Sequence, residues 1–357
     1  MRCILLLIVM LNFYSGCLNN TGGKIIKESQ QISKVWELQS YNWILSSLSV
    51  YQQELFFGGT DNFFYCVDLE SGKTKWKFKT QGECYFPPTF AADKIFFTSF
   101  DFFLYGLSKE GKEVWRYKLP GRVKSHPIFY SGIIIVSVTN GGILAIDMDT
   151  GKLSWELPQG ITSLSTTQPI LSSDILLLGN LNNTFSAINL QNGLLIWEKS
   201  YGSVILSTPS AYDTIVVFGG FNPIDIQKTF INAVNIKTGN EIWKKTLDYN
   251  ARYSSLFYEG KIYLGTESSE IICLNATDGA EIWKAKLAVD GIGSEIIALN
   301  DRLYFGGYER NFYVIDALTG HQINKSSFHY GISNPLFEKA TVFFGTGEGI
   351  LYRVKTL

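Results

Sequence analysis

Cysteine is scarce in this chain, and its few cysteines are poorly placed for a metal site or a disulfide framework. Five occur in 357 residues, and two of them, Cys3 and Cys17, lie in the N-terminal stretch. The other three, Cys66, Cys84 and Cys273, form an odd number and include no pair separated by two residues. We therefore expect neither a zinc site nor structural disulfides.

Charge and helical periodicity are also sparse. Charged residues make up 18% of the chain, the formal net charge is −1, and no run of basic residues occurs, which argues against nucleic-acid binding. No segment beyond the N-terminus has apolar residues at i, i+3, i+4 and i+7, so we expect no helix. The three histidines, His126, His321 and His329, fall at different repeat positions and are interpreted as solvated or loop-packing residues. No catalytic fingerprint occurs in a usable context, and no catalytic residue or metal ligand is assigned.

One hairpin pattern, in contrast, recurs throughout the chain. Residues 66–78 read CVDLESGKTKWKF, an apolar strand end, a turn that closes on Gly72 and a Trp four residues later. The turn glycines recur every 39 to 46 residues, at Gly72, Gly111, Gly151, Gly193, Gly239, Gly279 and Gly320. A fixed period in this range indicates a repeat architecture.

Each repeat predicts four antiparallel strands in about 40 residues. A short apolar run such as ELFFGG (54–59) or RLYFGG (302–307) precedes each hairpin, and a weaker apolar segment precedes that run. The runs number eight but the hairpins with a turn number seven. KVWELQ (34–39) matches the missing outer strand and belongs with ILYRVKT (350–356). The fold class is therefore all-β, an eight-bladed β-propeller whose last blade is closed by the N-terminal strand.

Seven of the eight tryptophans occupy one position of this repeat, and we interpret them as packing residues whose N–H can reach a backbone acceptor. Asn324 takes that place in the seventh copy, where we expect locally poorer packing. The repeat tryptophans are Trp36, Trp76, Trp115, Trp155, Trp197, Trp243 and Trp283.

The recurring hairpin, preceded by an apolar run that ends in Gly, resembles the pyrroloquinoline-quinone-like (PQQ-like) propeller repeat over residues 34–357. The resemblance implies the propeller fold; enzymes and scaffolds both use this repeat. PQQ-dependent dehydrogenases, the enzymatic relatives, have adjacent cysteines, a calcium site and long loops, none of which this sequence matches. We therefore expect no enzyme activity and no cofactor.

The N-terminus has the features of a secretory signal with a lipidation site. One basic residue and the apolar run 3–11, too short to span a bilayer, precede YSGC (14–17), which resembles a bacterial lipobox with Cys17 as the acylated residue. A conventional signal cleaved nearby is the alternative. Residues 1–16 are thus predicted to be a signal peptide, 17–33 a flexible lipidated tether and 34–357 a single propeller domain. Leu18 favours an outer-membrane anchor facing the periplasm, by analogy with such lipoproteins.

A bare propeller on a lipid tether is similar to the lipoprotein subunit of the outer-membrane β-barrel assembly machine. This similarity implies an envelope scaffold that binds protein partners through one propeller face, with a quinoprotein dehydrogenase and a glycan- or cell-wall-binding lipoprotein as the alternatives. Sugar binding would need aromatic platforms flanked by paired carboxylates or amides, whereas protein contacts favour mixed aromatic and charged loops.

In a propeller, the loops between blades and those between the second and third strands share one face. Tyr249, Arg252, Tyr308 and Arg310 are our candidates for partner binding on that face, because aromatic residues and Arg dominate interface hot spots. Plugging of the ring mouth is the alternative role. The other loop residues of these types are Tyr41, Trp43, Tyr85, Arg122, Glu309 and Tyr330, and the longest loop is GGFNPIDIQKT (219–229).

Overall fold

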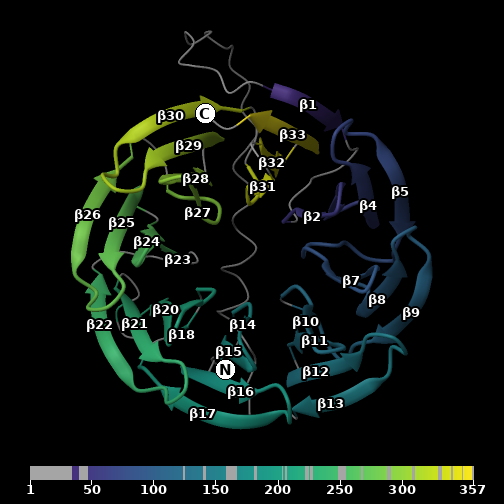
Figure 1. Ribbon diagram of the computed structural model, residues 1–357, viewed down its shortest axis with the longest axis horizontal. Helices are drawn as coiled ribbons and strands as arrows, with labels where there is room; N and C mark the ends of the chain where they lie inside the picture. The colour runs from purple at the N-terminus through teal and green to yellow at the C-terminus, as the bar shows by residue number, and fades with distance from the viewer. Residues whose placement is uncertain are drawn as a thin grey trace, which may run out of the picture. The chain divides into compact units, whose positions relative to one another are not determined.

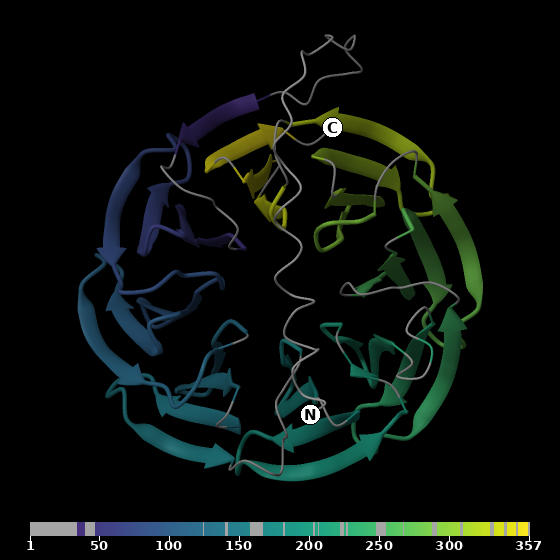
Figure 2. The same cartoon turned by 180° about the vertical axis from the view of Figure 1, so that it is seen from behind.

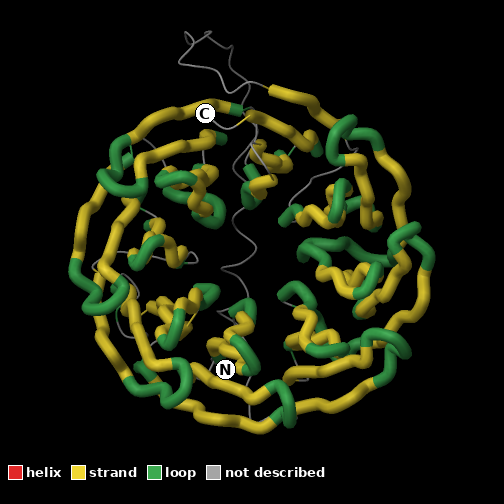
Figure 3. The backbone as a smooth tube through the Cα atoms, in the orientation of Figure 1, coloured by secondary structure: helices red, strands yellow, loops and turns green. Residues whose placement is uncertain are grey.

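Eight small antiparallel sheets are arranged in a ring in the computed structural model of this chain (Figure 1). All regular structure in the described residues is strand, as Figure 3 shows. The described residues are 34–39, 47–123, 125–139, 142–157, 167–180, 183–202, 204–205, 207–221, 225, 228–247, 255–266, 268–287, 291–307, 310–328, 332–338, 341–347 and 349–355.

Blades one to four each contain four consecutive strands, counted from the axis outwards. Blade one has β2 (Ser49–Tyr51), β3 (Glu54–Gly58), β4 (Phe63–Asp68) and β5 (Thr74–Lys79). Blade two has β6 (Thr89–Ala91), β7 (Lys94–Ser99), β8 (Phe103–Ser108) and β9 (Glu113–Lys118). Blade three has β10 (Ile128–Tyr130), β11 (Ile133–Val138), β12 (Gly142–Asp147) and β13 (Leu153–Leu157). Blade four has β14 (Ile170–Ser172), β15 (Ile175–Gly179), β16 (Thr184–Asn189) and β17 (Leu194–Ser200).

Blades five to eight follow the same plan with two variations. Blade five has β18 (Val204–Ile205), β19 (Ser210–Tyr212), β20 (Ile215–Phe221), β21 (Thr229–Asn235) and β22 (Glu241–Leu247). Blade six has β23 (Leu256–Tyr258), β24 (Lys261–Gly265), β25 (Glu270–Asn275) and β26 (Glu281–Lys286). Blade seven has β27 (Ile297–Leu299), β28 (Arg302–Gly306), β29 (Asn311–Asp316) and β30 (Gln322–Ser327). Blade eight has β31 (Leu336–Glu338), β32 (Thr341–Gly345), β33 (Ile350–Lys355) and, outermost, β1 (Lys34–Gln39).

The N-terminal strand closes the ring as the sequence predicts. β1 pairs antiparallel with β33, with Trp36 opposite Arg353 and Leu38 opposite Leu351. The two ends of the described chain therefore share one sheet, which Figure 2 shows from behind. The predicted all-β, eight-bladed propeller is confirmed, including the composition of its last blade.

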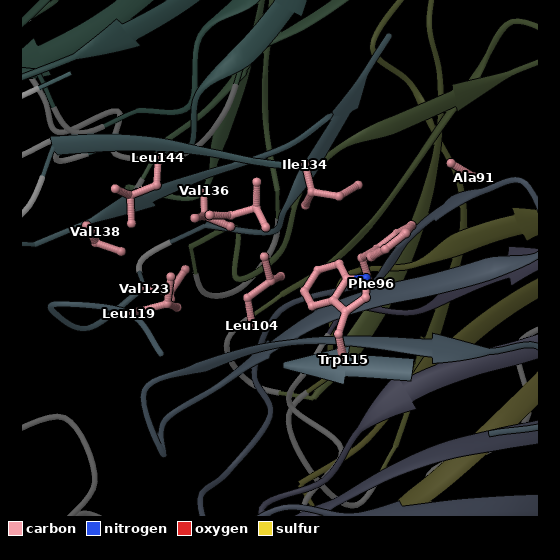
Figure 4. Close-up of a cluster of buried hydrophobic side chains, with 11 residues drawn as sticks. Ala91, Phe96, Leu104, Trp115, Leu119, Val123, Ile134, Val136, Val138 and Leu144 are labelled. Carbon is pink, nitrogen blue, oxygen red and sulfur yellow. The ribbon is translucent and has the colours of Figure 1, made fainter. Parts of the chain in front are cut away.

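The core lies between neighbouring blades, because the two middle strands of each blade are buried on both faces. In blade two, β7 and β8 have buried residues at four or more consecutive positions, whereas the outer β9 is exposed except at the buried Trp115 and the half-buried Tyr117. Figure 4 shows the cluster between blades two and three, in which Phe96 and Leu104 from one blade meet Val136 and Leu144 from the next. A single blade cannot bury both of its faces, so each blade depends on its neighbours for burial.

Blade five departs from the plan in the segment expected to be its longest loop. β20 and β21 form a long hairpin, so residues 219–221 and 229 are strand rather than loop. The crossover into this blade adds the short strand β18, which pairs with β20 at Phe221 and Gly220. The expectation of an 11-residue loop was therefore wrong at both ends of the segment, because the β-branched and aromatic residues there extend the strands.

The turn between the third and fourth strands explains the conserved frame of the hairpins within this chain. In blade three, Asp147 Oδ1 accepts the backbone N–H of Thr150 at 2.8 Å and its hydroxyl at 2.7 Å. These bonds hold the pKa of the Asp147 carboxyl below its usual value. Gly151 then adopts a φ of +67°, which Gly tolerates without a Cβ penalty. The acidic residues of these turns thus organise the backbone.

Each repeat tryptophan also packs on the turn of the next blade. The Trp197 ring of blade four lies against Gly239 of blade five, and its indole N–H donates to the Ile236 carbonyl at 2.8 Å. The same pattern links the remaining blades around the ring. The other indole donors and acceptors are Trp36 to Leu69, Trp76 to Lys109, Trp115 to Met148, Trp243 to Ala276 and Trp283 to Ala317, and the Trp155 ring lies on Gly193.

The junction between blades seven and eight is built differently. Blade eight has no turn between its third and fourth strands, because β33 and β1 come from opposite ends of the described chain. A Trp at position 324 would therefore have no turn glycine to pack on, which gives a physical reason for Asn324. The Asn324 side chain is 5% exposed. The expected poorer packing of blade seven stays a prediction.

A candidate protein-binding face

One face of the ring is built from the crossovers between blades and the turns between second and third strands. The crossover residue Val123 forms an isolated bridge with Val138 at the end of β11, and Ile292 does the same with Gly307. In blade two, the Phe100 N–H donates to the Glu83 carbonyl at 2.9 Å. Both kinds of loop therefore meet on the surface that we call the loop face.

Glycines at the ends of the second strands let the crossovers pass close to the sheet. A Cβ added to Gly58 would lie 2.1 Å from the carbonyl oxygen of Cys84, so only Gly fits there. Cys84 itself is buried, and burial raises the pKa of its thiol to about 12. Cys66 and Cys273 are also buried free thiols, so the three cysteines of the described chain act as small apolar residues.

The structure describes one of the four predicted partner-binding residues. Tyr249, Arg252 and Tyr308 lie outside the described residues, as does the predicted lipidation site Cys17. Arg310 is described and exposed in the turn between β28 and β29, and its carbonyl accepts the Phe328 N–H at 2.8 Å. Of the four candidates, Arg310 is thus the one that can be placed on the loop face.

Arg310 is held in an unfavourable backbone conformation. Its φ is +72°, in the left-handed region that costs a side-chain-bearing residue roughly 1–2 kcal/mol. Asn62, Asn183 and Gly349 occupy the corresponding turn position in blades one, four and eight, with φ between +66° and +75°. Asn and Gly tolerate this conformation, whereas Arg does not favour it. An outlier of this kind in an exposed turn points to a role for the side chain.

Phe102 occupies the same turn position in blade two and was missed by sequence reasoning. Its φ is +70° and its side chain is 39% exposed. The signal was present in the repeat, because alignment of the turns places Phe102 opposite Asn62 and Asn183. A large apolar residue at a position that favours Asn or Gly marks Phe102 as a departure from the repeat.

Polar residues link blades seven, eight and one just before their innermost strands. The Asn334 amide donates to Ser47 Oγ at 3.0 Å, and its oxygen accepts the Glu295 N–H at 2.9 Å. Burial raises the pKa of the Glu295 carboxyl. His126 precedes β10 at the corresponding position, and burial lowers the pKa of its imidazole. Asn334 of blade eight therefore contacts both of its neighbouring blades.

The described residues include neither a metal-binding cluster nor a membrane-spanning helix. Within them, His, Cys, Asp and Glu side chains form no group of three or more that could hold a metal ion. No helix in that part of the chain is long and apolar enough to cross a membrane. His321 is exposed in the outer turn of blade seven, and His329 lies outside the described residues.

Comparison with protein families matches residues 103–205 and 227–356 to the family described as outer membrane protein assembly factor BamB. Among curated proteins, BamB of Marinobacter adhaerens is 28% identical over 127 residues, which are 34% of this chain and 32% of that protein. The beta-alanine-activating enzyme of Mus musculus is 31% identical over 115 residues, 29% of this chain and 10% of that enzyme. The chain thus matches about a third or less of the length of these curated relatives.

Solved structures share the fold over nearly the whole chain. The crystal structure of BamB from Moraxella catarrhalis superposes with a TM-score of 0.77 at 12% identity, covering 91% of this chain and 100% of that one. The computationally designed Ika8 protein gives the same TM-score at 16% identity, covering 90% and 99%. At these identities the likeness establishes the propeller architecture and nothing of its use.

Proposed function

Because this chain belongs to the family of outer membrane protein assembly factor BamB, we propose that it is a non-catalytic scaffold of the bacterial cell envelope that takes part in outer-membrane protein assembly. It binds protein partners through the loop face. The observation that carries this proposal is the match to that family over most of the propeller, in a ring whose loop face presents a conformationally strained, exposed Arg310. Arg is enriched in the centres of protein interfaces, and an unfavourable φ is retained where a side chain has a use.

The proposed partner site consists of Tyr249, Arg252, Tyr308 and Arg310, from the crossover between blades five and six and the inner turn of blade seven. Aromatic and guanidinium groups suit a protein surface better than a sugar, which would need paired carboxylates or amides beside an aromatic platform. The proposed partners are components of the outer-membrane protein assembly machinery. The proposed role requires no cofactor.

A triple variant tests the site. Arg252→Glu and Arg310→Glu combined with Tyr308→Ala should weaken co-purification with the assembly machinery from detergent-solubilised envelopes by tenfold or more, since hot-spot substitutions cost about 2 kcal/mol or more each. The melting temperature should not fall, because we expect these residues to contribute to partner binding and not to packing between blades.

A matched control carries the same change of charge away from the loop face. Lys73→Glu and Lys237→Glu alter exposed residues of the turns between the third and fourth strands of blades one and five, and Leu318→Ala alters a 53% exposed residue of the same kind of turn in blade seven. This control should keep its partners. Equal co-purification of the triple variant and the control would contradict the proposed site, and loss from both would mean that charge alone governs binding.

We propose that the chain is anchored by a lipid on Cys17 after removal of residues 1–16, with residues 17–33 as the tether and the outer membrane, periplasmic side, as its location. Cys17→Ser should move the protein from the membrane to the soluble fraction, because a tether without acyl chains has little membrane affinity. Fractionation and metabolic labelling with a fatty acid measure this. Unchanged membrane association without label in the parent chain would remove the lipid anchor from the proposal.

A further inference from the structure

Phe102 presents an aromatic side chain at the loop face at a conformational cost. It lies between β7 and β8, its N–H donates to the Ser99 carbonyl at 3.2 Å, and its own carbonyl accepts the Leu119 N–H at 2.8 Å. Both backbone bonds are available to any residue, so neither requires a phenyl ring. The φ of +70° favours Gly or Asn, and the ring is 39% exposed. The fold would lose nothing evident if this residue were Gly.

Other aromatic side chains gather beside this turn. Tyr85, from the crossover between blades one and two, has its ring centroid 4.7 Å from that of Phe100. Phe86 lies 6.5 Å from Phe100 and packs on the core between blades two and three. The three rings are half-buried, whereas Phe102 is exposed. Tyr85, Phe86 and Phe100 thus form an aromatic cluster at the turn that carries Phe102.

Arg122 adds an exposed positive charge to this cluster. Its guanidinium carbon lies 5.9 Å from the centre of the Phe100 ring, which orients the side chain along the aromatic surface. Its backbone carbonyl accepts the Thr139 N–H at 2.9 Å and so fixes the crossover. Among the described residues, no carboxylate lies within ion-pairing distance of the Arg122 guanidinium.

The nearby carboxylate is already engaged within the blade. Asp101 accepts the Gln81 N–H at 3.0 Å, the Phe103 N–H at 3.1 Å and the Tyr105 hydroxyl at 2.7 Å. Burial and this hydrogen bond raise the pKa of the Tyr105 hydroxyl, so it remains a donor. Asp101 therefore organises the turn and, like the other described carboxylates, forms no ion pair with Arg122.

From this arrangement we propose that Tyr85, Phe86, Phe100, Phe102 and Arg122 form a docking surface, the blade-two platform, for an acidic segment of a partner protein. An aliphatic or aromatic side chain of the segment covers Phe102, and a neighbouring Asp or Glu pairs with Arg122. Charge complementarity selects an acidic partner, and the aromatic support selects one with an apolar residue next to its carboxylate. The inference rests on the proposed function only in placing a partner on the loop face.

The test is a titration of the purified full chain in detergent with two dye-labelled peptides, GSDLEFDSG and its amide counterpart GSNLQFNSG, followed by fluorescence anisotropy at low salt. The acidic peptide should bind about tenfold or more tightly than the amide peptide. Phe102→Gly and Arg122→Gln should each weaken binding of the acidic peptide by about tenfold. Tyr212→Ala, which removes a 62% exposed aromatic from the opposite face, should leave binding unchanged.

Phe102→Gly separates binding from folding, because Gly relieves the unfavourable φ. Its melting temperature should equal or exceed that of the parent chain while binding falls. Equal affinity for the two peptides, absence of saturable binding, unchanged binding by either platform variant, or a lowered melting temperature for Phe102→Gly would each overturn the proposal. Co-purification by the Arg310 site does not enter this measurement, so the two proposals fail independently.

Discussion

Deletion of residues 34–39 is expected to destabilise the whole propeller, lowering its free energy of unfolding by at least about 3 kcal/mol, because it removes a whole paired strand together with the half-buried Trp36. The deletion removes Trp36, whose ring lies 5.8 Å from that of Phe343 and whose N–H donates to the Leu69 carbonyl. It also leaves the outer edge of β33 unpaired. Because blades share their cores, loss of one edge weakens both of its neighbours. Denaturant unfolding followed by tryptophan fluorescence measures the effect.

Arg353 makes this junction especially sensitive. It stands opposite Trp36, is 8% exposed, and its guanidinium contacts Glu70 Oε2 at 2.9 Å and the Leu69 carbonyl at 3.1 Å. Removal of β1 exposes the Arg353 guanidinium to water, whereas Glu70 is already 62% exposed, and so weakens the hold of Arg353 on blade one. The contact between blades eight and one therefore depends on β1, at the N-terminal end of the described chain, and on Arg353, near its C-terminal end.

Deletion of residues 18–30 is the control, and it should have little effect on unfolding because it removes none of the paired residues of β1. A second control restores the strand in a new order. A chain in which residues 34–39 are moved to follow residue 355, joined by a turn of the Asp-x-x-Thr-Gly type, should recover most of the lost stability. If the two deletions unfold at the same denaturant concentration, β1 does not close the ring.

The fold could be predicted from sequence because several copies of the repeat each indicate the same structure. Each hairpin by itself is ambiguous, but six copies that each carry a turn glycine and a Trp four residues later indicate a ring of equivalent blades. The mismatch between eight apolar runs and seven turns then required a strand from the N-terminus, and β1 pairs as expected. The reason for Asn324 also follows from that mismatch, although the structure was needed to see that its turn is missing.

The features that distinguish one blade from another could not be predicted in the same way. Phe102 and Arg353 are single departures from the repeat, and a sequence pattern identifies a departure without showing what it contacts. The turn that holds Phe102 at positive φ and the bidentate approach of Arg353 to Glu70 depend on backbone positions. Loop residues such as Tyr249 were chosen as partner-binding candidates by residue type alone, and their role stays a prediction.

Gly239→Ala is expected to be among the most damaging single-atom additions in this chain. Gly239 has a φ of +65°, and a Cβ there would lie 2.7 Å from the Trp197 ring. The backbone penalty alone is roughly 1–2 kcal/mol. Displacing a ring whose residue is 8% exposed, and whose N–H is bonded to the Ile236 carbonyl, should raise the total to about 3 kcal/mol or more. Thermal and denaturant unfolding measure it.

Gly260→Ala separates the two contributions, because Gly260 has a φ of +68° but nothing within 4 Å of its added Cβ. It should cost only the backbone penalty. In a chain that already carries Trp197→Ala, Gly239→Ala should likewise cost only about 1–2 kcal/mol, since the ring it displaces is gone. The difference between the two backgrounds measures the coupling of Trp197 to Gly239. If Gly239→Ala costs the same with and without Trp197, the tryptophans do not lock one blade to the next, and burial between the middle strands alone must hold the ring together.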